Sequence, residues 1–347
     1  MHRSTVMFLA VTICLATGDH VFGDEPITTG TALAVLNGET PPAPPAGYES
    51  EKAAIAALEG GKVPIVNLFE PTPANVVVTG GVEYSKAGET PMLLDLYQPK
   101  GISKPAPALI FIHGGGWKGG KRNDYRYYCQ RFAAKGYVTA TITYRLTSRD
   151  EEKNVKNPFP AALHDAKAAV RFIRANAAKY YVNPDQIAVL GGSAGGHLSM
   201  MVGYSSDVPE LEGDGGNSNV SSRVQAVVNL YGPTDLTKPM AQVSKLVIDF
   251  VGGKKYDEAP EIYSKISPLT YITKDDPPTL ILHGTVDAIV QVDQSDLLAA
   301  KLKETGVPYI YDRLPGWPHA MDLAAPVNER CTWLMDRFLA KYVPLPE

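Results

Sequence analysis

One serine lies in a glycine-rich pattern that suits a nucleophile. Ser193 stands in GGSAGG, residues 191–196, directly after the apolar run 187–190 and before a helical run. Glycines here permit a tight strand-to-helix turn that pushes the serine side chain out above a sheet. The start of the following helix favours negative charge as the hydroxyl attacks a carbonyl. The pattern predicts that Ser193 is a nucleophile, and the alternative is a structural glycine-rich turn.

A second glycine run follows the apolar segment 109–112. It reads HGGGW over residues 113–117. Acyl transfer needs N–H donors where a carbonyl oxygen becomes an oxyanion, and glycines let backbone N–H groups converge without interference from side chains. We expect the N–H groups of Gly115, Gly116 and Ala194, the residue after the nucleophile, to form this oxyanion hole. The alternative is a flexible loop.

The general base has to be one of seven histidines. His319 lies in GWPHA, residues 316–320, after the last predicted strand. Hydrolases with this type of serine turn carry the serine, the acid and the histidine in that chain order, which favours His319. The other histidines are expected elsewhere: His2 and His20 in the N-terminal region, His113 orienting the glycine loop, His164 and His197 in helices, and His283 buried at a strand end.

The acid is expected after the strand that precedes the histidine strand. The run TLILHG, residues 279–284, leads into Asp287, which is therefore the predicted acid. Asp235 is the alternative, because an acid occasionally comes from an earlier strand. Two other aspartates are given structural roles: Asp293 as the N-cap of the following helix, and Asp322 as a residue that shapes the histidine loop.

Apolar strand-like runs alternate with helical runs from about residue 75 onward. This alternation predicts an α/β fold of the α/β-hydrolase type, with a mainly parallel sheet covered by helices on both faces. Active sites in such folds lie beyond the carboxyl ends of the strands, where the candidates above are found. The expected strands are 76–78, 93–96, 109–112, 137–144, 187–190, 226–231, 279–284 and 308–314. The expected helices are 51–59, 125–134, 160–180, 195 onward, 295–303 and 327–342.

The chain is predicted to have three parts: residues 1–23, 24–72 and 73–347. The first has Arg3 before an apolar run, which indicates a signal peptide and a secreted or periplasmic protein, with an ordinary helix as the alternative. The second contains the Pro-rich stretch PPAPPAGYES and is expected to be a spacer or an arm over the active-site mouth. The third is expected to be the catalytic domain.

Composition is typical of a soluble globular protein. Hydrophobic residues make up 44%, charged residues 20%, and the net charge is −4, so we expect no nucleic-acid partner. No run after residue 23 is long and apolar enough to span a membrane. Histidines and aspartates show no zinc-like spacing, and no phosphate-binding GxxxxGK loop occurs, so we expect chemistry without metal or cofactor.

Two cysteines remain once residues 1–23 are removed. They are Cys129 and Cys331, on helices expected on the same side of the sheet. They are compatible with one disulfide in an oxidising compartment or with two buried thiols, and both alternatives stay open.

Five motifs stand in one order along the chain: HGGGW at 113–117, GGSAGGHL at 191–198, YGPTDL at 231–236, HGTVD at 283–287 and PHAMD at 318–322. Over roughly residues 75–345 the chain resembles the bacterial acetyl xylan esterase and feruloyl esterase-like branch of the α/β-hydrolases, related to hormone-sensitive-lipase-like esterases. The resemblance implies carboxylic ester hydrolysis, often of acetyl groups on polysaccharide. It implies the roles given above for Ser193, Asp287, His319, Gly115, Gly116 and Ala194. One departure is Gly192, where many hormone-sensitive-lipase-like members carry Asp.

The sequence therefore predicts a secreted serine ester hydrolase that removes short acyl groups from a carbohydrate such as xylan through an acyl-enzyme. We expect Trp117 and the segments 205–222 and 238–268 to shape the substrate pocket, with core packing and surface connection as the alternatives. The absence of a large apolar lid favours a short acyl group. The other hypotheses are a general short-chain carboxylesterase or lipase, an amidase or peptidase, and an inactive hydrolase that serves as a binding module.

Overall fold

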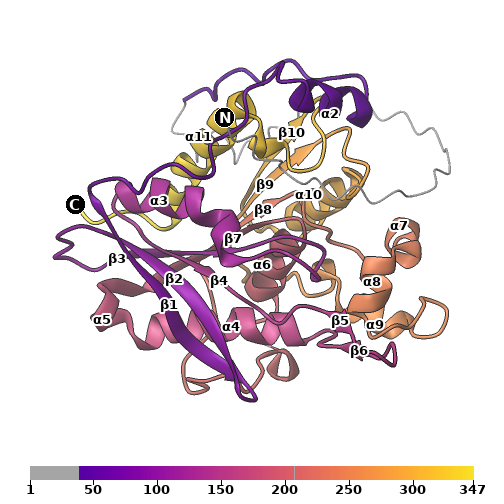
Figure 1. The fold of residues 1–347 in the computed structure, drawn as a ribbon, viewed down its shortest axis with the longest axis horizontal. Helices are drawn as coiled ribbons and strands as arrows, with labels where there is room; N and C mark the ends of the chain where they lie inside the picture. The colour runs from indigo at the N-terminus through magenta and orange to yellow at the C-terminus, as the bar shows by residue number, and fades with distance from the viewer. Residues whose placement is uncertain (1–38, 207) are drawn as a thin grey trace.

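A twisted sheet of eight strands crosses the molecule, with helices on both sides (Figure 1). The computed structural model describes residues 39–206 and 208–347, so the predicted signal peptide lies outside the described residues. The strand order is β1-β2-β4-β3-β7-β8-β9-β10. The pairs β1–β2 and β2–β4 are antiparallel, and the remaining neighbours are parallel. The strands are β1 (Val76–Ala87), β2 (Thr90–Pro99), β3 (Ala106–Ile112), β4 (Val138–Ile142), β7 (Val182–Gly192), β8 (Ala226–Leu230), β9 (Thr279–Gly284) and β10 (Tyr309–Leu314).

Two apolar cores lie on the two faces of this sheet. In β3 every residue is buried, and successive side chains alternate between the cores: Leu109 and Phe111 face one, Ile110 and Ile112 the other. The first core packs against α3 (Arg126–Ala134) and α11 (Ala325–Tyr342). The second packs against α4 (Ala161–Ala175), α6 (Ala194–Tyr204) and α10 (Asp293–Thr305). Among the described residues, no helix is long and apolar enough to cross a membrane.

The predicted α/β fold is confirmed, and each predicted strand is present. The predicted helix at 160–180 is divided at Asn176 into α4 and the short α5 (Ala177–Tyr180). The sequence analysis missed elements that are too short for a periodic pattern. They are the hairpin of β5 (Ser148–Arg149) and β6 (Val155–Lys156), and the helices α7 (Pro239–Val243), α8 (Lys245–Phe250) and α9 (Pro260–Lys265).

The part of the leader that is described packs along the catalytic region of the chain. The predicted helix at 51–59 is confirmed as α2 (Glu51–Glu59), and the hydroxyl of its N-cap Ser50 accepts from the N–H of Ala53 at 3.3 Å. Farther on, Ile65 forms an antiparallel bridge with Ala324, close to the histidine loop. This stretch is therefore attached to the sheet domain rather than free of it.

The helices that carry the two cysteines lie on the same face of the sheet, as expected. Cys129 on α3 and Cys331 on α11 are both buried in the first core, and both are free thiols. The structure therefore has the arrangement of two buried thiols, not the disulfide.

Candidate active site

Ser193 occupies the sharp turn between β7 and α6. Its backbone has φ 55° and ψ −124°, a conformation that costs about 1–3 kcal/mol in a non-glycine residue. The turn leaves no room for side chains beside it: a Cβ on Gly195 would lie 2.0 Å from the carbonyl oxygen of Ile112. The N–H of Ser193 donates to the carbonyl of Leu230 at 2.9 Å, which helps hold the strained residue in place.

The HGGGW loop lies directly against this turn. A Cβ on Gly114 would come within 2.8 Å of the Gly192 oxygen and 3.3 Å of the Ser193 Cβ. Gly115 and Gly116 have φ of 108° and 59°, in the left-handed region that favours glycine. The structure thus brings the predicted oxyanion loop to the predicted nucleophile, and it places Ala194 at the first position of α6.

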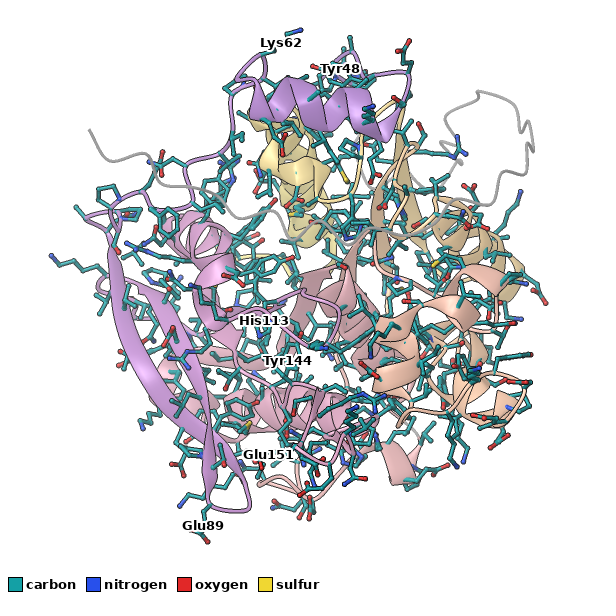
Figure 2. The ribbon with its side chains drawn as sticks, turned by 45° about the vertical axis from the view of Figure 1, so that its right-hand side comes forward. Tyr48, Lys62, Glu89, His113, Tyr144 and Glu151 are labelled. Atoms are coloured by element: carbon teal, nitrogen blue, oxygen red, sulfur yellow. The ribbon has the colours of Figure 1, made fainter. Side chains whose placement is uncertain are left out.

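His113 fixes the start of this loop by hydrogen bonding, as expected. Its Nδ1 donates to the carbonyl of Gly114 at 2.8 Å, and its ring stacks on Tyr144 at 4.3 Å. Figure 2 shows the two side chains together in the centre of the molecule. The hydroxyl of Tyr144 donates to the His113 carbonyl at 2.9 Å. Burial lowers the pKa of His113, so its ring is neutral at pH 7.

Asp287 and His319 are joined by a short hydrogen bond. Nδ1 of His319 lies 2.6 Å from Oδ2 of Asp287, so it carries the proton and leaves Nε2 free to accept one. The other carboxylate oxygen accepts from the N–H groups of Ile289 and Val290 at 2.9 and 2.8 Å. Burial alone would raise the pKa of Asp287, but the charge of His319 and the hydrogen bonds of two histidines hold it well below its usual range.

The second of these histidines is His283, whose contact with the acid the sequence analysis missed. Its Nε2 lies 3.2 Å from Oδ2 of Asp287 and 2.9 Å from the carbonyl of Val290. Both partners are acceptors, so Nε2 carries the proton and Nδ1 accepts from the hydroxyl of Ser295 at 2.7 Å. The side chain is fully buried, as predicted. The spacing of four residues in HGTVD was the available signal.

Tyr231 lies near both His319 and the turn that carries Ser193. Its ring lies 4.7 Å from the ring of His319, and a Cβ on Gly192 would come within 2.8 Å of its hydroxyl. That hydroxyl donates to the buried carboxylate of Asp322, which also accepts from Tyr128. Sequence reasoning gave Tyr231 no role, although it stands at a strand end in YGPTDL.

The structure brings Asp287 and His319 into direct contact, and no hydrogen bond joins His319 to Ser193 in it. All three belong to the described residues. Catalytic hydrogen bonds are often long before substrate binds and tighten in the complex. Tyr231 lies close to both groups: its ring is beside the ring of His319, and its hydroxyl is beside Gly192, the residue before Ser193.

Trp117, the predicted pocket wall, is buried in the core. Its ring stacks on Phe250 at 4.4 Å, and its indole N–H donates to Nδ1 of His197 at 3.2 Å. Trp117 therefore has the core-packing role, which is the alternative to a pocket wall. A different residue approaches the oxyanion loop: a Cβ on Gly116 would lie 2.7 Å from Cδ1 of the half-buried Leu246 on α8. The segment 238–268 therefore brings Leu246 beside the predicted oxyanion loop, and its role in shaping the substrate pocket stays a prediction.

Three sequence-based expectations differ from the structure. Asp293 is the first residue of α10 rather than its N-cap, which is Val292; its charge still faces the positive end of the helix. Asp235 uses its carboxylate in its own turn, accepting from the N–H of Thr237 at 3.0 Å. The segment 205–222 lies against α4 and β1: Arg171 of α4 donates to three of its carbonyls.

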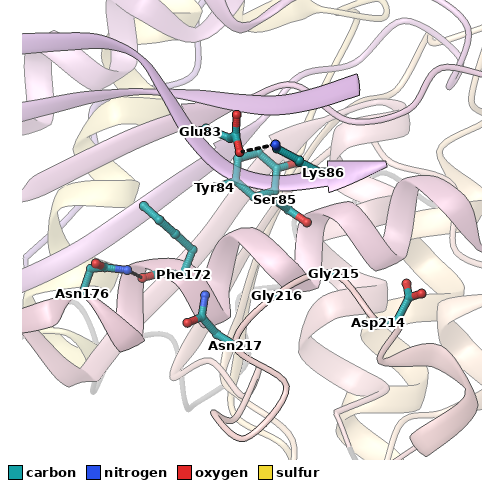
Figure 3. A pocket seen from close by; sticks show the side chains of 10 residues that line it. All are labelled: Glu83, Tyr84, Ser85, Lys86, Phe172, Asn176, Asp214, Gly215, Gly216 and Asn217. Atoms are coloured by element: carbon teal, nitrogen blue, oxygen red, sulfur yellow. Dashed lines mark hydrogen bonds and ion pairs between the residues drawn. The ribbon is translucent and has the colours of Figure 1, made fainter. Parts of the chain in front are cut away.

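A hollow of 430 Å³ lies between β1, α4 and this segment (Figure 3). None of the candidate catalytic or oxyanion residues lines it. Its lining residues are Glu83, Tyr84, Ser85, Lys86, Phe172, Asn176, Asp214, Gly215, Gly216 and Asn217. Over the described part of the chain, no group of three or more His, Cys, Asp or Glu side chains has the arrangement to hold a metal ion.

The strand order, the serine turn and the hydrogen-bonded acid and histidine define an esterase-type α/β-hydrolase. The BD-FAE family model matches residues 94–302, and the chain belongs to this family of α/β-hydrolase esterases. Matched residues include the glycine loop, Ser193 and Asp287, whereas His319 and the leader lie outside them.

Known proteins with similar sequences and structures are esterases. Esterase LipQ of Mycobacterium tuberculosis is 31% identical over 293 residues, 82% of this chain and 66% of that protein. A truncated carbohydrate esterase from gut microbiota is 28% identical, with a TM-score of 0.63, over 76% of this chain and 96% of that one. Thermogutta terrifontis esterase 2 is 26% identical, with a TM-score of 0.66, over 81% and 100%. The chain spans 59–66% of the length of the three mycobacterial esterases it matches.

Proposed function

We propose that this chain is an exported serine esterase that removes short acyl groups, above all acetyl, from a carbohydrate such as xylan. Ser193 is the nucleophile, His319 the general base and Asp287 the acid. The observation that carries the proposal is the 2.6 Å hydrogen bond between Asp287 and His319, on the loops that follow β9 and β10. Export is proposed from the residue pattern of 1–23.

The first half of the reaction transfers the acyl group to the enzyme. The Ser193 hydroxyl oxygen attacks the ester carbonyl carbon while Nε2 of His319 takes its proton. The N–H groups of Gly115, Gly116 and Ala194 hold the resulting oxyanion, with help from the N-terminus of α6. When the tetrahedral intermediate collapses, the carbon–oxygen bond to the alcohol breaks and His319 returns the proton to that alcohol.

The second half releases the acid. Water attacks the acyl-enzyme carbonyl, His319 takes a proton from the water, and the proton then passes to the Ser193 oxygen as its bond to the acyl group breaks. Asp287 keeps the proton of His319 on Nδ1 and stabilises the imidazolium that forms twice in each cycle. The hydrogen bonds from the backbone N–H groups of Ile289 and Val290 hold the Asp287 carboxylate in the orientation that faces His319.

Two observations support a short acyl group on a carbohydrate. Leu246 approaches within van der Waals distance of Gly116, which restricts the space beside the oxyanion hole. The similar gut-microbiota structure is named as a carbohydrate esterase. A bifunctional GH43-CE protein of Bacteroides eggerthii is 26% identical with a TM-score of 0.65, over 75% of this chain and 38% of that one. An acetyl group is small enough for the restricted space beside Gly116, and a polysaccharide as the alcohol agrees with the likeness to a carbohydrate esterase.

The second candidate is a general short-chain carboxylesterase. It is favoured by the likeness to Thermogutta terrifontis esterase 2, which is described with butyrate bound. Both candidates use the same residues and differ in the alcohol and in the length of the acyl chain.

The test is to assay residues 24–347 with p-nitrophenyl acetate, butyrate and octanoate, and to measure acetate released from acetylated xylan. Ser193→Ala is the control, and its kcat should fall by about 10⁴-fold or more. Preference for acetate with release of acetate from xylan supports the proposal. Preference for butyrate or octanoate with untouched xylan favours the general carboxylesterase. Equal rates for both proteins would overturn the role of Ser193.

A further inference from the structure

The described leader contacts the backbone just before His319. The N–H of Tyr48 donates to the carbonyl of Gly316 at 2.8 Å, and the indole N–H of Trp317 donates to the carbonyl of Pro45 at 3.1 Å. The rings of Tyr48 and Trp317 meet edge to face at 5.7 Å. Figure 1 shows α2 at the top of the molecule beside β10 and α11, and Figure 2 shows Tyr48 in the same region.

The backbone at Gly47 lies so close to the backbone of Pro315 and Gly316 that no side chain fits between them. A Cβ on Gly47 would lie 2.0 Å from the carbonyl oxygen of Pro315 and 2.6 Å from the Cα of Gly316. Both obstacles are backbone atoms, so rotation of a side chain cannot relieve the contact. Trp317, two residues before His319, is covered by this part of the leader and is only 1% exposed.

The leader also holds the backbone that follows His319. The N–H of Val66 donates to the carbonyl of Leu323 at 2.9 Å, and the N–H of Ala325 donates to the carbonyl of Pro64 at 2.8 Å. Together with the contacts at residues 315–317, these hydrogen bonds attach the leader to the histidine loop both before and after His319.

Glu51 lies in the leader between these two contact regions, and its side chain contacts the loop that carries Asp287. Its Oε1 accepts from the N–H of Ala288 at 3.3 Å, one residue after Asp287. Burial raises the pKa of Glu51, the hydrogen bond from the Ala288 N–H opposes that rise, and the charges of Asp287 and His319 act on it in opposite directions.

We propose that residues 45–66 are a clamp that positions His319, and that Glu51 in this clamp is a positioning residue for the Asp287–His319 pair. The inference rests on the proposed catalytic role of that pair. According to this proposal the Pro-rich leader acts in catalysis and is not only a spacer. Neither the clamp nor His319 lies within the residues that match the family model.

The first test is Gly47→Val, with Gly80→Val as the matched control. A Cβ on Gly80 meets only a side-chain oxygen of Asp95, at an ordinary 3.4 Å. With p-nitrophenyl acetate, Gly47→Val should lower kcat roughly 10- to 100-fold with little change in KM, because a small displacement of a catalytic group has such an effect. The low-field proton resonance of the His319–Asp287 hydrogen bond should shift or broaden. Unchanged kcat and resonance would overturn the proposal.

The second test is Glu51→Gln, which keeps the shape of the side chain and removes its charge. The exposed Glu49→Gln is the control, since it changes net charge equally two residues away. The ionisable groups near the imidazole are Asp287, Asp322, Glu51 and Tyr231, and His283 lies on the far side of Asp287. Loss of the Glu51 charge makes the imidazolium less stable, so the acid limb of the kcat/KM profile should move to lower pH by about 0.3. A profile identical to that of Glu49→Gln would contradict the role of Glu51.

These outcomes separate the clamp from the proposed function. If the wild-type chain hydrolyses no ester, the proposed function fails. If the wild type is active and both clamp variants match it, only the clamp fails. If Gly47→Val does not fold, the clamp proposal is tested by Glu51→Gln alone, because glutamine has nearly the same shape as glutamate and creates no steric conflict.

Discussion

The hydroxyl of Tyr231 donates a 2.5 Å hydrogen bond to Oδ1 of Asp322. The ring of the same tyrosine lies 4.7 Å from the ring of His319. Burial raises the pKa of Asp322, while hydrogen bonds from Tyr231 and Tyr128 oppose that rise. A buried carboxylate thus fixes a tyrosine, and the tyrosine limits where the imidazole can lie.

Tyr231→Phe should slow the enzyme and destabilise it. The ring remains, but Asp322 loses one of its two tyrosine hydroxyls, and a buried acceptor without its donor costs about 1–3 kcal/mol. Urea unfolding measures that loss, and kcat with p-nitrophenyl acetate should fall several-fold. Tyr127→Phe is the matched control, because its hydroxyl donates to Asn328 at 2.9 Å in the same region. Equal kcat values for both variants would exclude a role of Tyr231 in positioning the base.

Asp287→Asn should leave the loop in place and remove most of the activity. An amide does not hold the His319 proton on Nδ1 as a carboxylate does, so the ring loses its correct tautomer and the stabilisation of its cation. Comparable substitutions in serine hydrolases lower kcat by about 10⁴-fold. Steady-state kinetics at pH 7 measures the effect. A loss below tenfold would mean that Asp287 is not the group that orients His319 for catalysis.

The same aspartate makes stability depend on pH. Its pKa in the folded state is below the value of about 3.9 in the unfolded chain. In the window between these two values the unfolded state binds more protons, so the stabilisation by Asp287 is present above about pH 4 and is lost as the pH falls through that window. Urea unfolding at pH 7, 5 and 4 should show a constant deficit for Asp287→Asn, which shrinks below pH 4. A deficit that stays constant down to pH 3 would contradict this origin.

His283→Leu tests the second histidine on the acid. The variant leaves Ser295 and the carbonyl of Val290 without their buried partner, so we expect a loss of about 1–3 kcal/mol in unfolding free energy. Because Asp287 keeps its bond to His319, kcat should fall by less than in Asp287→Asn. The control is His164→Leu on α4, a half-buried histidine under Gly213. If kcat is the same in both histidine variants, His283 has no influence on the acid.

Local patterns were sufficient to predict the strands, the main helices and the loops that carry Ser193, Asp287 and His319. Each depends on residues near one another in sequence: apolar runs, glycines at a turn, and polar residues directly after strands. The contact of Tyr231 with His319 depends on two strand ends meeting in space, and no local pattern contains it. Trp117 is in the core because Phe250 of α8, 133 residues later in the chain, stacks against it.

Leu246→Ala should change which acyl chains the enzyme prefers. The side chain of Leu246 lies against Gly116 of the predicted oxyanion loop, and its removal opens space where an acyl chain would extend. Accommodating added methylenes in an apolar site changes kcat/KM by about 10- to 200-fold, so the ratio of butyrate to acetate hydrolysis should rise by about tenfold. Val243→Ala is the control in the same segment, since Val243 is 76% exposed. If the ratio stays at the wild-type value, Leu246 does not limit acyl length, and the preference for short chains must come from another wall of the site.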